Sequence, residues 1–242
     1  MMRQLLLIGV CLAAASVMVS GAGGESVTTC SGTFAGTVAD LAVAANGYCD
    51  LEGATITHDL SVGQNAILIA SDTTIGHDLN ASKPSSILTG FSTIAPLSGG
   101  SVRVGHDLIV SGSNAPQFAG LALCDTVVGH DLRVTGTVLT CVLVVGDTSQ
   151  DFCSYSPSPA DRVGHDLIVS NNFAYEFIDV GNNTVGHELV VAGNTTNSLG
   201  NYIDVSDNII ARDASCSNNT PPPSKDDTND GPNHASHNNT CP

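Results

Sequence analysis

Pairs of histidine and aspartate recur along this sequence, and these residue types are well suited to bind a cation or to transfer a proton. Six segments share one motif, in which an apolar residue is followed by Gly or Thr, then His, then Asp or Glu, then Leu. The histidines are His58, His77, His106, His130, His165 and His187. The acidic residues that follow them are Asp59, Asp78, Asp107, Asp131, Asp166 and Glu188. Partial copies of the motif lie at 37–43 and 210–214.

Three roles are open to these pairs. In the first, the glycine allows the backbone conformation of a corner, and the aspartate accepts hydrogen bonds from corner amides. In the second, they bind a metal, because calcium suits carboxylate oxygens and zinc or copper suits imidazole. That metal ladder would contain His58, His77, His106, His130, His165 and His187 with Asp107, Asp131 and Asp166. In the third, the imidazoles titrate, and thermal stability shifts between about pH 5 and 8.

The repetition predicts the fold. Successive motif histidines are 19 to 35 residues apart, and another apolar residue precedes most copies at a fixed distance, as Leu68 precedes Ile75 and Leu97 precedes Val104. Each repeat therefore consists of short β-branched runs separated by Gly, Asn and Asp. One such unit cannot bury its apolar face, whereas stacked units form a continuous core. We predict an all-β, single-stranded parallel β-helix of about seven to eight coils over 23–216, with insertions at one corner.

Stacking has a consequence for the histidine–aspartate pairs. Matching residues of successive coils lie above one another at about 4.8 Å in a parallel sheet. The six histidines should therefore form one ladder, and the six acidic residues should form a second ladder beside it.

The two ends of the chain differ from the repeat. Residues 1–22 contain a basic Arg3, an apolar run and the small residues Ser20-Gly21-Ala22, which together are typical of a signal peptide. The sequence thus predicts a secreted protein without a membrane span in its mature chain. Residues 217–242 are rich in Asn, Pro, Asp and Ser, so we expect a disordered C-terminal tail.

Seven cysteines follow the predicted signal peptide, and export makes disulfides the default. The candidates are Cys30, Cys49, Cys124, Cys141, Cys153, Cys216 and Cys241. The expected pairs are Cys30–Cys49, Cys216–Cys241, and Cys124 with either Cys141 or Cys153. Because the number is odd, one thiol stays free or pairs with another molecule.

The charge and composition of the chain limit the partners and the classes of function that we expect. The chain has 7 Lys and Arg residues against 23 Asp and Glu residues, a net charge of −16, so nucleic acid is not an expected partner. The chain has no Trp and four Tyr, so aromatic platforms for sugars are scarce. We predict no catalytic residues and no cofactor other than a divalent cation. The expected function is that of a non-enzymatic structural or surface-interaction protein of the cell envelope or extracellular space. The alternative is a carbohydrate-active lyase or hydrolase on a β-helix.

The motif resembles that of a group of uncharacterised secreted bacterial proteins, common in actinobacteria, whose coils read Val-Gly-Gly-Asn-Leu-x-Val. The resemblance extends from about Cys30 to Asn219 and includes the opening segment 46–56. This sequence has His-Asp where that group has Gly-Asn. The resemblance implies a parallel β-helix and implies no known activity. A more distant similarity is to bactofilins, which are polymer-forming β-helices without a signal peptide.

Overall fold

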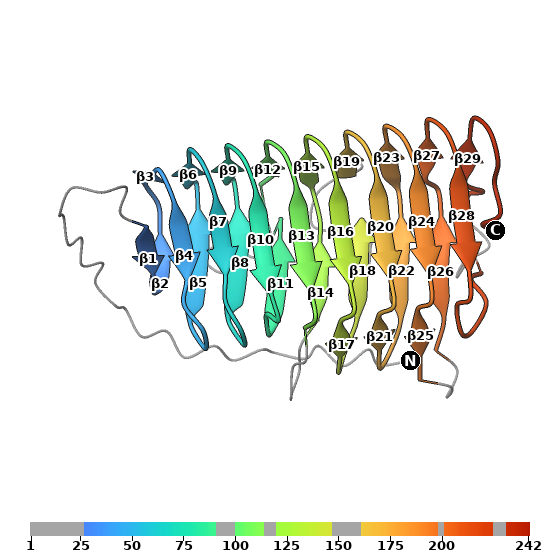
Figure 1. Cartoon of the computed structure of the whole chain (residues 1–242), viewed down its shortest axis with the longest axis horizontal. Helices are drawn as coiled ribbons and strands as arrows, with labels where there is room; N and C mark the ends of the chain where they lie inside the picture. The colour runs from blue at the N-terminus through green and yellow to red at the C-terminus, as the bar shows by residue number, and fades with distance from the viewer. Residues whose placement is uncertain (1–26, 91–99, 114–119, 147–160, 198–200, 225–230) are drawn as a thin grey trace, which may run out of the picture.

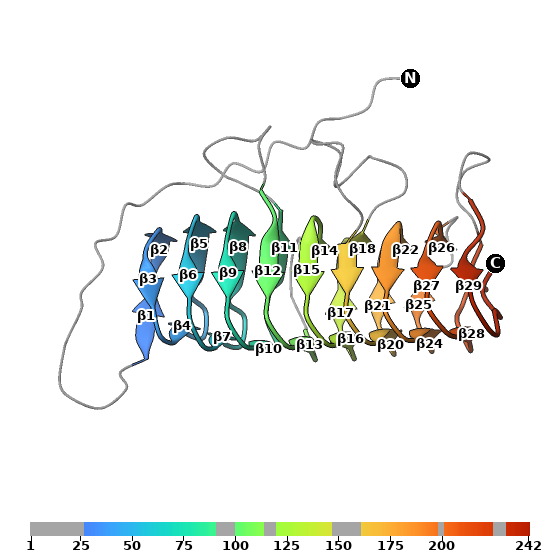
Figure 2. The ribbon, with the colours of Figure 1, turned by 90° about the horizontal axis from the view of Figure 1, so that it is seen from above.

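The computed structural model describes residues 27–90, 100–113, 120–146, 161–197, 201–224 and 231–242. In these residues the chain winds through three parallel sheets, A, B and C, in a fixed order, and returns to sheet A one rung further along (Figures 1 and 2). Sheets A and C have nine strands each, sheet B has eight, and a short sheet D has three. The predicted all-β parallel β-helix is confirmed, with one coil more than expected. None of the described residues forms a helix with the length and apolar character needed to cross a bilayer.

The strands are short and nearly uniform in length. Sheet A contains β1 (Thr28–Cys30), β4 (Leu41–Val43), β7 (Leu60–Val62), β10 (Leu79–Ser82), β13 (Leu108–Ser111), β16 (Leu132–Thr135), β20 (Leu167–Ser170), β24 (Leu189–Ala192) and β28 (Ala214–Ser217). Sheet B contains β2 (Gly32–Phe34), β5 (Tyr48–Glu52), β8 (Ile67–Ser71), β11 (Ser86–Thr89), β14 (Leu121–Leu123), β18 (Leu143–Gly146), β22 (Ile178–Gly181) and β26 (Ile203–Ser206). Sheet C contains β3 (Thr37–Val38), β6 (Thr55–Ile56), β9 (Thr74–Ile75), β12 (Val102–Val104), β15 (Thr126–Val128), β19 (Asp161–Val163), β23 (Asn183–Val185), β27 (Ile209–Ile210) and β29 (His234–Ala235). Sheet D contains β17 (Val138–Leu139), β21 (Phe173–Ala174) and β25 (Thr195–Thr196).

The repeated motif spans the corner between sheets C and A. Its first apolar residue ends a strand of sheet C, its Gly-His-Asp turns the corner, and its Leu begins a strand of sheet A. In register, Leu108 pairs with Leu132 and Val104 pairs with Val128, and all four are almost fully buried. Burying a Leu or Val side chain contributes roughly 1.5–3 kcal/mol, so these columns form the main apolar core.

Two details of the prediction are wrong: the residue that stacks on Leu68 in the next coil, and the restriction of insertions to one corner. The partner of Leu68 in the next coil is Ile87, and Leu97 lies outside the described residues. Insertions were expected at one corner, but long connections occur at two, between sheets A and B and between sheets B and C. The corner between sheets C and A has two residues between β3 and β4 and three residues in every later coil, and its backbone makes hydrogen bonds to both neighbouring coils.

The described part of the C-terminal tail is ordered, contrary to the prediction of disorder over 217–242. β29 pairs with β27, with His234 beside Ile209, and Ala214 forms a bridge with Asn239. These residues continue the solenoid by one coil, which explains why sheet C has one strand more than sheet B. The polar composition of these residues did not predict a coil, because the inward positions of this coil are filled by hydrogen-bonded asparagine as well as by apolar side chains.

Buried asparagines form two ladders inside the corners. One contains Asn172, Asn194 and Asn219, and the other contains Asn183, Asn208 and Asn233. In each, an amide nitrogen donates to the amide oxygen of the next coil, as from Asn183 Nδ2 to Asn208 Oδ1 at 2.9 Å. The same nitrogen also donates to a backbone carbonyl, that of Val145, at 3.0 Å. These bonds satisfy corner groups that would be costly to bury alone.

Candidate functional site

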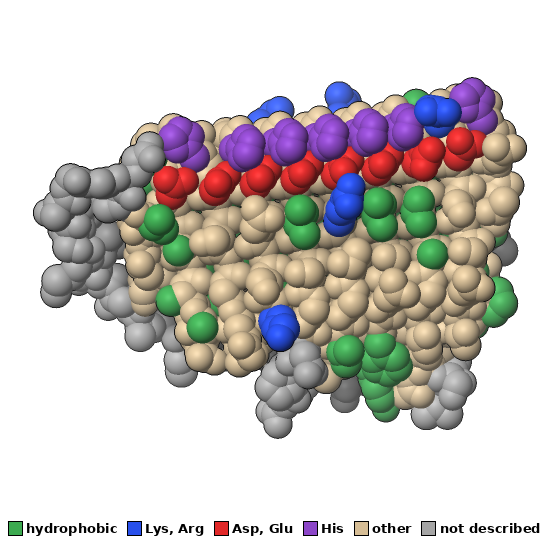
Figure 3. Space-filling view, in the orientation of Figure 1, with side chains coloured by type: hydrophobic (Ala, Val, Ile, Leu, Met, Phe, Trp, Pro, Cys, Tyr) green, Lys and Arg blue, Asp and Glu red, His purple; other side chains and the backbone are tan. Residues whose placement is uncertain are grey.

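The six predicted histidines lie along one edge of the rod, at the corner between sheets C and A. Figure 3 shows a row of histidine side chains along this edge, beside a parallel row of acidic side chains. Backbone hydrogen bonds connect the corners directly, as from His130 N–H to the carbonyl of His106 at 2.9 Å and from His165 N–H to that of His130 at 2.9 Å. The predicted pair of ladders is therefore present.

Five of the histidine rings form one stack. The ring centroids are 5.1 Å apart between His77 and His106, 4.9 Å between His106 and His130, 4.8 Å between His130 and His165, and 4.4 Å between His165 and His187. The planes of successive rings differ by 1–7°. The rings therefore point in the same direction, and one edge of each faces the solvent.

Glycine precedes each of the five stacked histidines, and close approach explains its presence. A Cβ on Gly105 would overlap the backbone carbonyl of Gly76 in the preceding coil, and one on Gly129 would overlap that of Gly105. These glycines are not among the residues with positive φ, so the corner requires glycine for this close approach and not for a left-handed backbone. Thr57 precedes His58, the motif histidine that begins the row.

A carboxylate of the preceding coil holds each stacked ring. The Nδ1 atom lies 2.9 Å from Asp59 Oδ1 in His77, and 2.9 Å from Asp107 Oδ1 in His130. The remaining stacked rings have equivalent contacts of 2.8–3.1 Å with Asp78, Asp131 and Asp166. An ionised carboxylate only accepts hydrogen bonds, so Nδ1 carries a proton and donates it. In His58 the corresponding separation, to Asp40 Oδ2, is 3.9 Å.

The same carboxylates organise the corner backbone. Asp107 Oδ1 accepts a hydrogen bond from the N–H of Asp131 at 3.0 Å, and Asp131 Oδ1 accepts one from the N–H of Asp166 at 3.1 Å. Each aspartate thus fixes both the ring and the backbone of the following coil. This observation supports the predicted structural role of Asp as an acceptor for corner amides.

The contacts shift several pKa values. The hydrogen bond to Asp59 is the main cause that raises the pKa of His77, and the bond to Asp107 does the same for His130. Burial raises the pKa of Asp131, but hydrogen bonds from Arg133, from the backbone N–H of Asp166 and from His165 lower it to about 2. Asp131 therefore stays ionised at neutral pH.

The ladder continues at its C-terminal end into the partial copy at 210–214 and then into His237 and Asn238, which were not predicted as part of it. Arg212 occupies the histidine position of the next coil, and its Nη1 lies 2.7 Å from His187 Nε2. Since a guanidinium only donates, His187 Nε2 accepts this hydrogen bond. His237 then follows Arg212, with Asn238 in the acidic position beside Asp213. His237 and Asn238 follow Arg212 and Asp213 by 25 residues, and this spacing is the feature of the sequence that could have predicted their place in the ladder.

The ladder brings potential metal ligands together. Four overlapping groups, each made of two successive histidines and the aspartate between them, have one ligand atom per residue within 4.8 Å of one another. They comprise His77, Asp78 and His106; His106, Asp107 and His130; His130, Asp131 and His165; and His165, Asp166 and His187. His58 of the predicted metal ladder is outside these groups.

Disulfides connect the coils at both ends of the rod. Cys30 pairs with Cys49, and Cys216 pairs with Cys241, as predicted. Cys124 is also disulfide-bonded, whereas Cys141 is a free thiol, so the alternative pairing of these two is wrong. Cys153 lies outside the described residues, as does the predicted signal peptide at 1–22.

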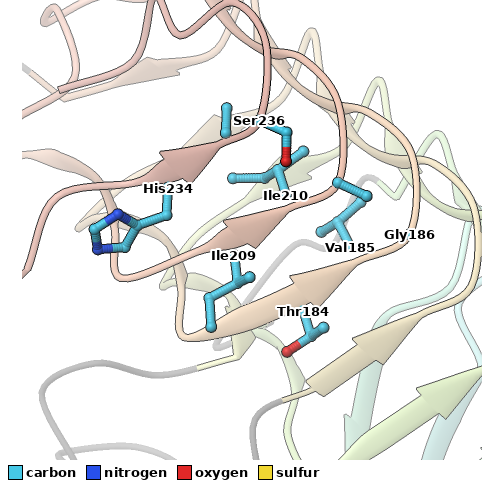
Figure 4. A pocket seen from close by; sticks show the side chains of 9 residues that line it. Thr184, Val185, Gly186, Ile209, Ile210, His234 and Ser236 are labelled. Atoms are coloured by element: carbon cyan, nitrogen blue, oxygen red, sulfur yellow. The ribbon is translucent and has the colours of Figure 1, made fainter.

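A shallow depression lies on the outer face of sheet C near the C-terminal end. Figure 4 shows Thr184, Ile209 and His234 from strands β23, β27 and β29 along it. His234 is its one titratable side chain, and its lining contains no carboxylate. The depression therefore lacks the pair of acidic groups that glycoside hydrolysis usually requires.

Comparisons with family models, with curated proteins and with solved structures found no match to this chain.

Proposed function

We propose that the protein is a secreted, non-enzymatic rod that presents its histidine–aspartate corner as a repetitive binding surface to components of the cell envelope or extracellular space. The observation that carries this proposal is the continuity of the ladder. Stacked imidazoles and carboxylates follow one edge at a nearly constant spacing over five coils. Such periodicity suits a partner that is contacted at many equivalent points along the rod.

Two further features support this role. The disulfides Cys30–Cys49 and Cys216–Cys241 tie the first and last coils, and such bonds persist in oxidising compartments. The ladder aspartates also serve the local structure, since each holds a ring and a backbone amide, rather than converging on one reacting centre. No specific observation favours the lyase or hydrolase alternative.

The proposal is tested by co-sedimentation of the purified, oxidised protein with isolated envelopes of the producing cells. We expect saturable binding that falls at least about tenfold when His106 and His165 are both replaced by Gln, because the stacked surface is then interrupted twice. Replacement of His234 by Gln is the matched control, since this histidine lies on the outer face of sheet C. Equal binding by the ladder variant and the wild type would refute the proposed surface, and degradation of envelope polysaccharide would instead support the enzymatic alternative.

A further inference from the structure

The solvent-facing nitrogens of the histidine stack have the properties of metal ligands. The Nδ1–H of each stacked ring is held by a carboxylate, as His130 is by Asp107, so the lone pair of Nε2 points away from it. A carboxylate behind an imidazole is the usual second-shell partner of a zinc-bound histidine, because it fixes the tautomer and increases the basicity of the ligating nitrogen.

The Nε2 atom of His187 already contacts a positively charged side chain, that of Arg212. The guanidinium of Arg212 donates to His187 Nε2 at 2.7 Å. At the other stacked corners, the next coil presents another imidazole in the position that Arg212 takes. His77, His106, His130 and His165 therefore form a row of nitrogen ligands, which is followed by His187 and then by Arg212.

The spacing of the rings limits how many ions this row can hold. Two nitrogens bound to one tetrahedral zinc ion at about 2.0–2.1 Å lie roughly 3.4 Å apart. The rings of His130 and His165 are 4.8 Å apart, so they must tilt toward each other to share an ion. Their side chains are 44% and 42% exposed, so no packed core opposes the tilt. Because one Nε2 atom binds one ion, adjacent gaps cannot both be filled.

We propose that the stacked histidines bind two zinc-like divalent transition-metal ions, one between His77 and His106 and one between His130 and His165. Arg212 excludes His187 from this pairing. The aspartates face Nδ1 and not Nε2, so they act as positioning residues, and the remaining ligands of each ion are water or groups of a partner. This inference deepens the proposed function by naming a ligand for the corner, and it rests on that function only for the biological use of the ion.

The binding is tested on the purified, oxidised full chain without envelopes, so that it can fail independently of the proposed function. After removal of metals with a chelator, zinc binding is measured at pH 7.5 by calorimetry and by metal analysis after dialysis. We expect two ions per chain, one in His106→Gln and none in a variant that also carries His165→Gln. Calcium and magnesium should not bind at this row, because they prefer oxygen ligands.

Further variants separate the row from other zinc ligands. His234→Gln and Cys141→Ser should keep two ions, since neither residue belongs to the stack. Asp107→Asn should weaken binding at the site of His130 by about 10- to 100-fold, as loss of a second-shell carboxylate does. Circular dichroism checks that each variant keeps its fold. Absence of saturable zinc binding by the wild type, or two ions in the doubly substituted variant, would overturn the proposal.

Discussion

Asp161 occupies a position at which asparagine would satisfy the structure better. It stands directly above Asn183 in sheet C, at the head of one asparagine ladder, and is 2% exposed. Its Oδ1 accepts a hydrogen bond from the N–H of Thr126 at 2.7 Å. Its Oδ2 and Asn183 Oδ1 are both buried without a hydrogen-bond partner among the described residues. Burial is the main cause that raises the pKa of Asp161 to about 8, so this carboxyl group is protonated at neutral pH.

We expect Asp161→Asn to stabilise the protein in a pH-dependent way. In the folded protein the carboxyl group keeps its proton at pH 7, although this pH is roughly 3 units above its ordinary pKa of 3.8. Each pH unit corresponds to about 1.4 kcal/mol, so folding at pH 7 is opposed by about 4 kcal/mol. An amide removes this opposition, and its Nδ2 can donate to Asn183 Oδ1, which contributes about 1 kcal/mol more.

The sign of the pH dependence follows from proton linkage. The folded wild type binds one proton more than the unfolded chain between pH 3.8 and about 8. Its stability contribution from this group is therefore complete below pH 3.8 and is lost as the pH rises through 8. The difference between variant and wild type should grow over this window and remain constant at higher pH.

Urea denaturation followed by circular dichroism, from pH 4.5 to 9, measures this difference. Equal m-values in both proteins would show that the free energies can be compared. Asn183→Asp is a matched control of opposite sign, because it places a second carboxyl group beside the first and should destabilise the protein most at high pH. A difference between Asp161→Asn and the wild type that does not change with pH would refute the assignment of a protonated Asp161.

Three other perturbations test the corner and the last coil. Gly129→Ala should cost roughly 1–3 kcal/mol in urea denaturation, because its Cβ would overlap the carbonyl of Gly105; an unchanged midpoint would contradict the close-approach argument. Asp107→Asn should lower the pKa of His130, measured by NMR titration, because this carboxylate is the main cause that raises it; an unshifted midpoint would argue against the contact. Cys241→Ser opens a disulfide that spans 25 residues, so the last coil should lose about 3 kcal/mol of stability and become sensitive to protease, and resistance equal to the wild type would disprove its role.

The sequence alone predicted the architecture, because the motif repeats both its letters and its register. The apolar residue before Gly-His-Asp and the leucine after it were sufficient to place a corner between two strands. From this followed the stacking of His106 on His130. These features depend on local periodicity, which a linear sequence displays directly. The disulfides Cys30–Cys49 and Cys216–Cys241 were predicted separately, from the expected export of the chain.

Other features required the tertiary structure. The hydrogen-bond partner of each stacked histidine ring is the aspartate of the preceding coil, and the spacing of the motif does not distinguish this aspartate from the one next to the histidine in the chain. Residues 231–242 complete a coil through backbone pairing and Asn233, although their composition is typical of disorder. The protonated Asp161 and the contact of Arg212 with His187 also arise between residues 22 or more positions apart. Pairing across coils decides these contacts, because connections of variable length hide which residues lie above one another until the chain is folded.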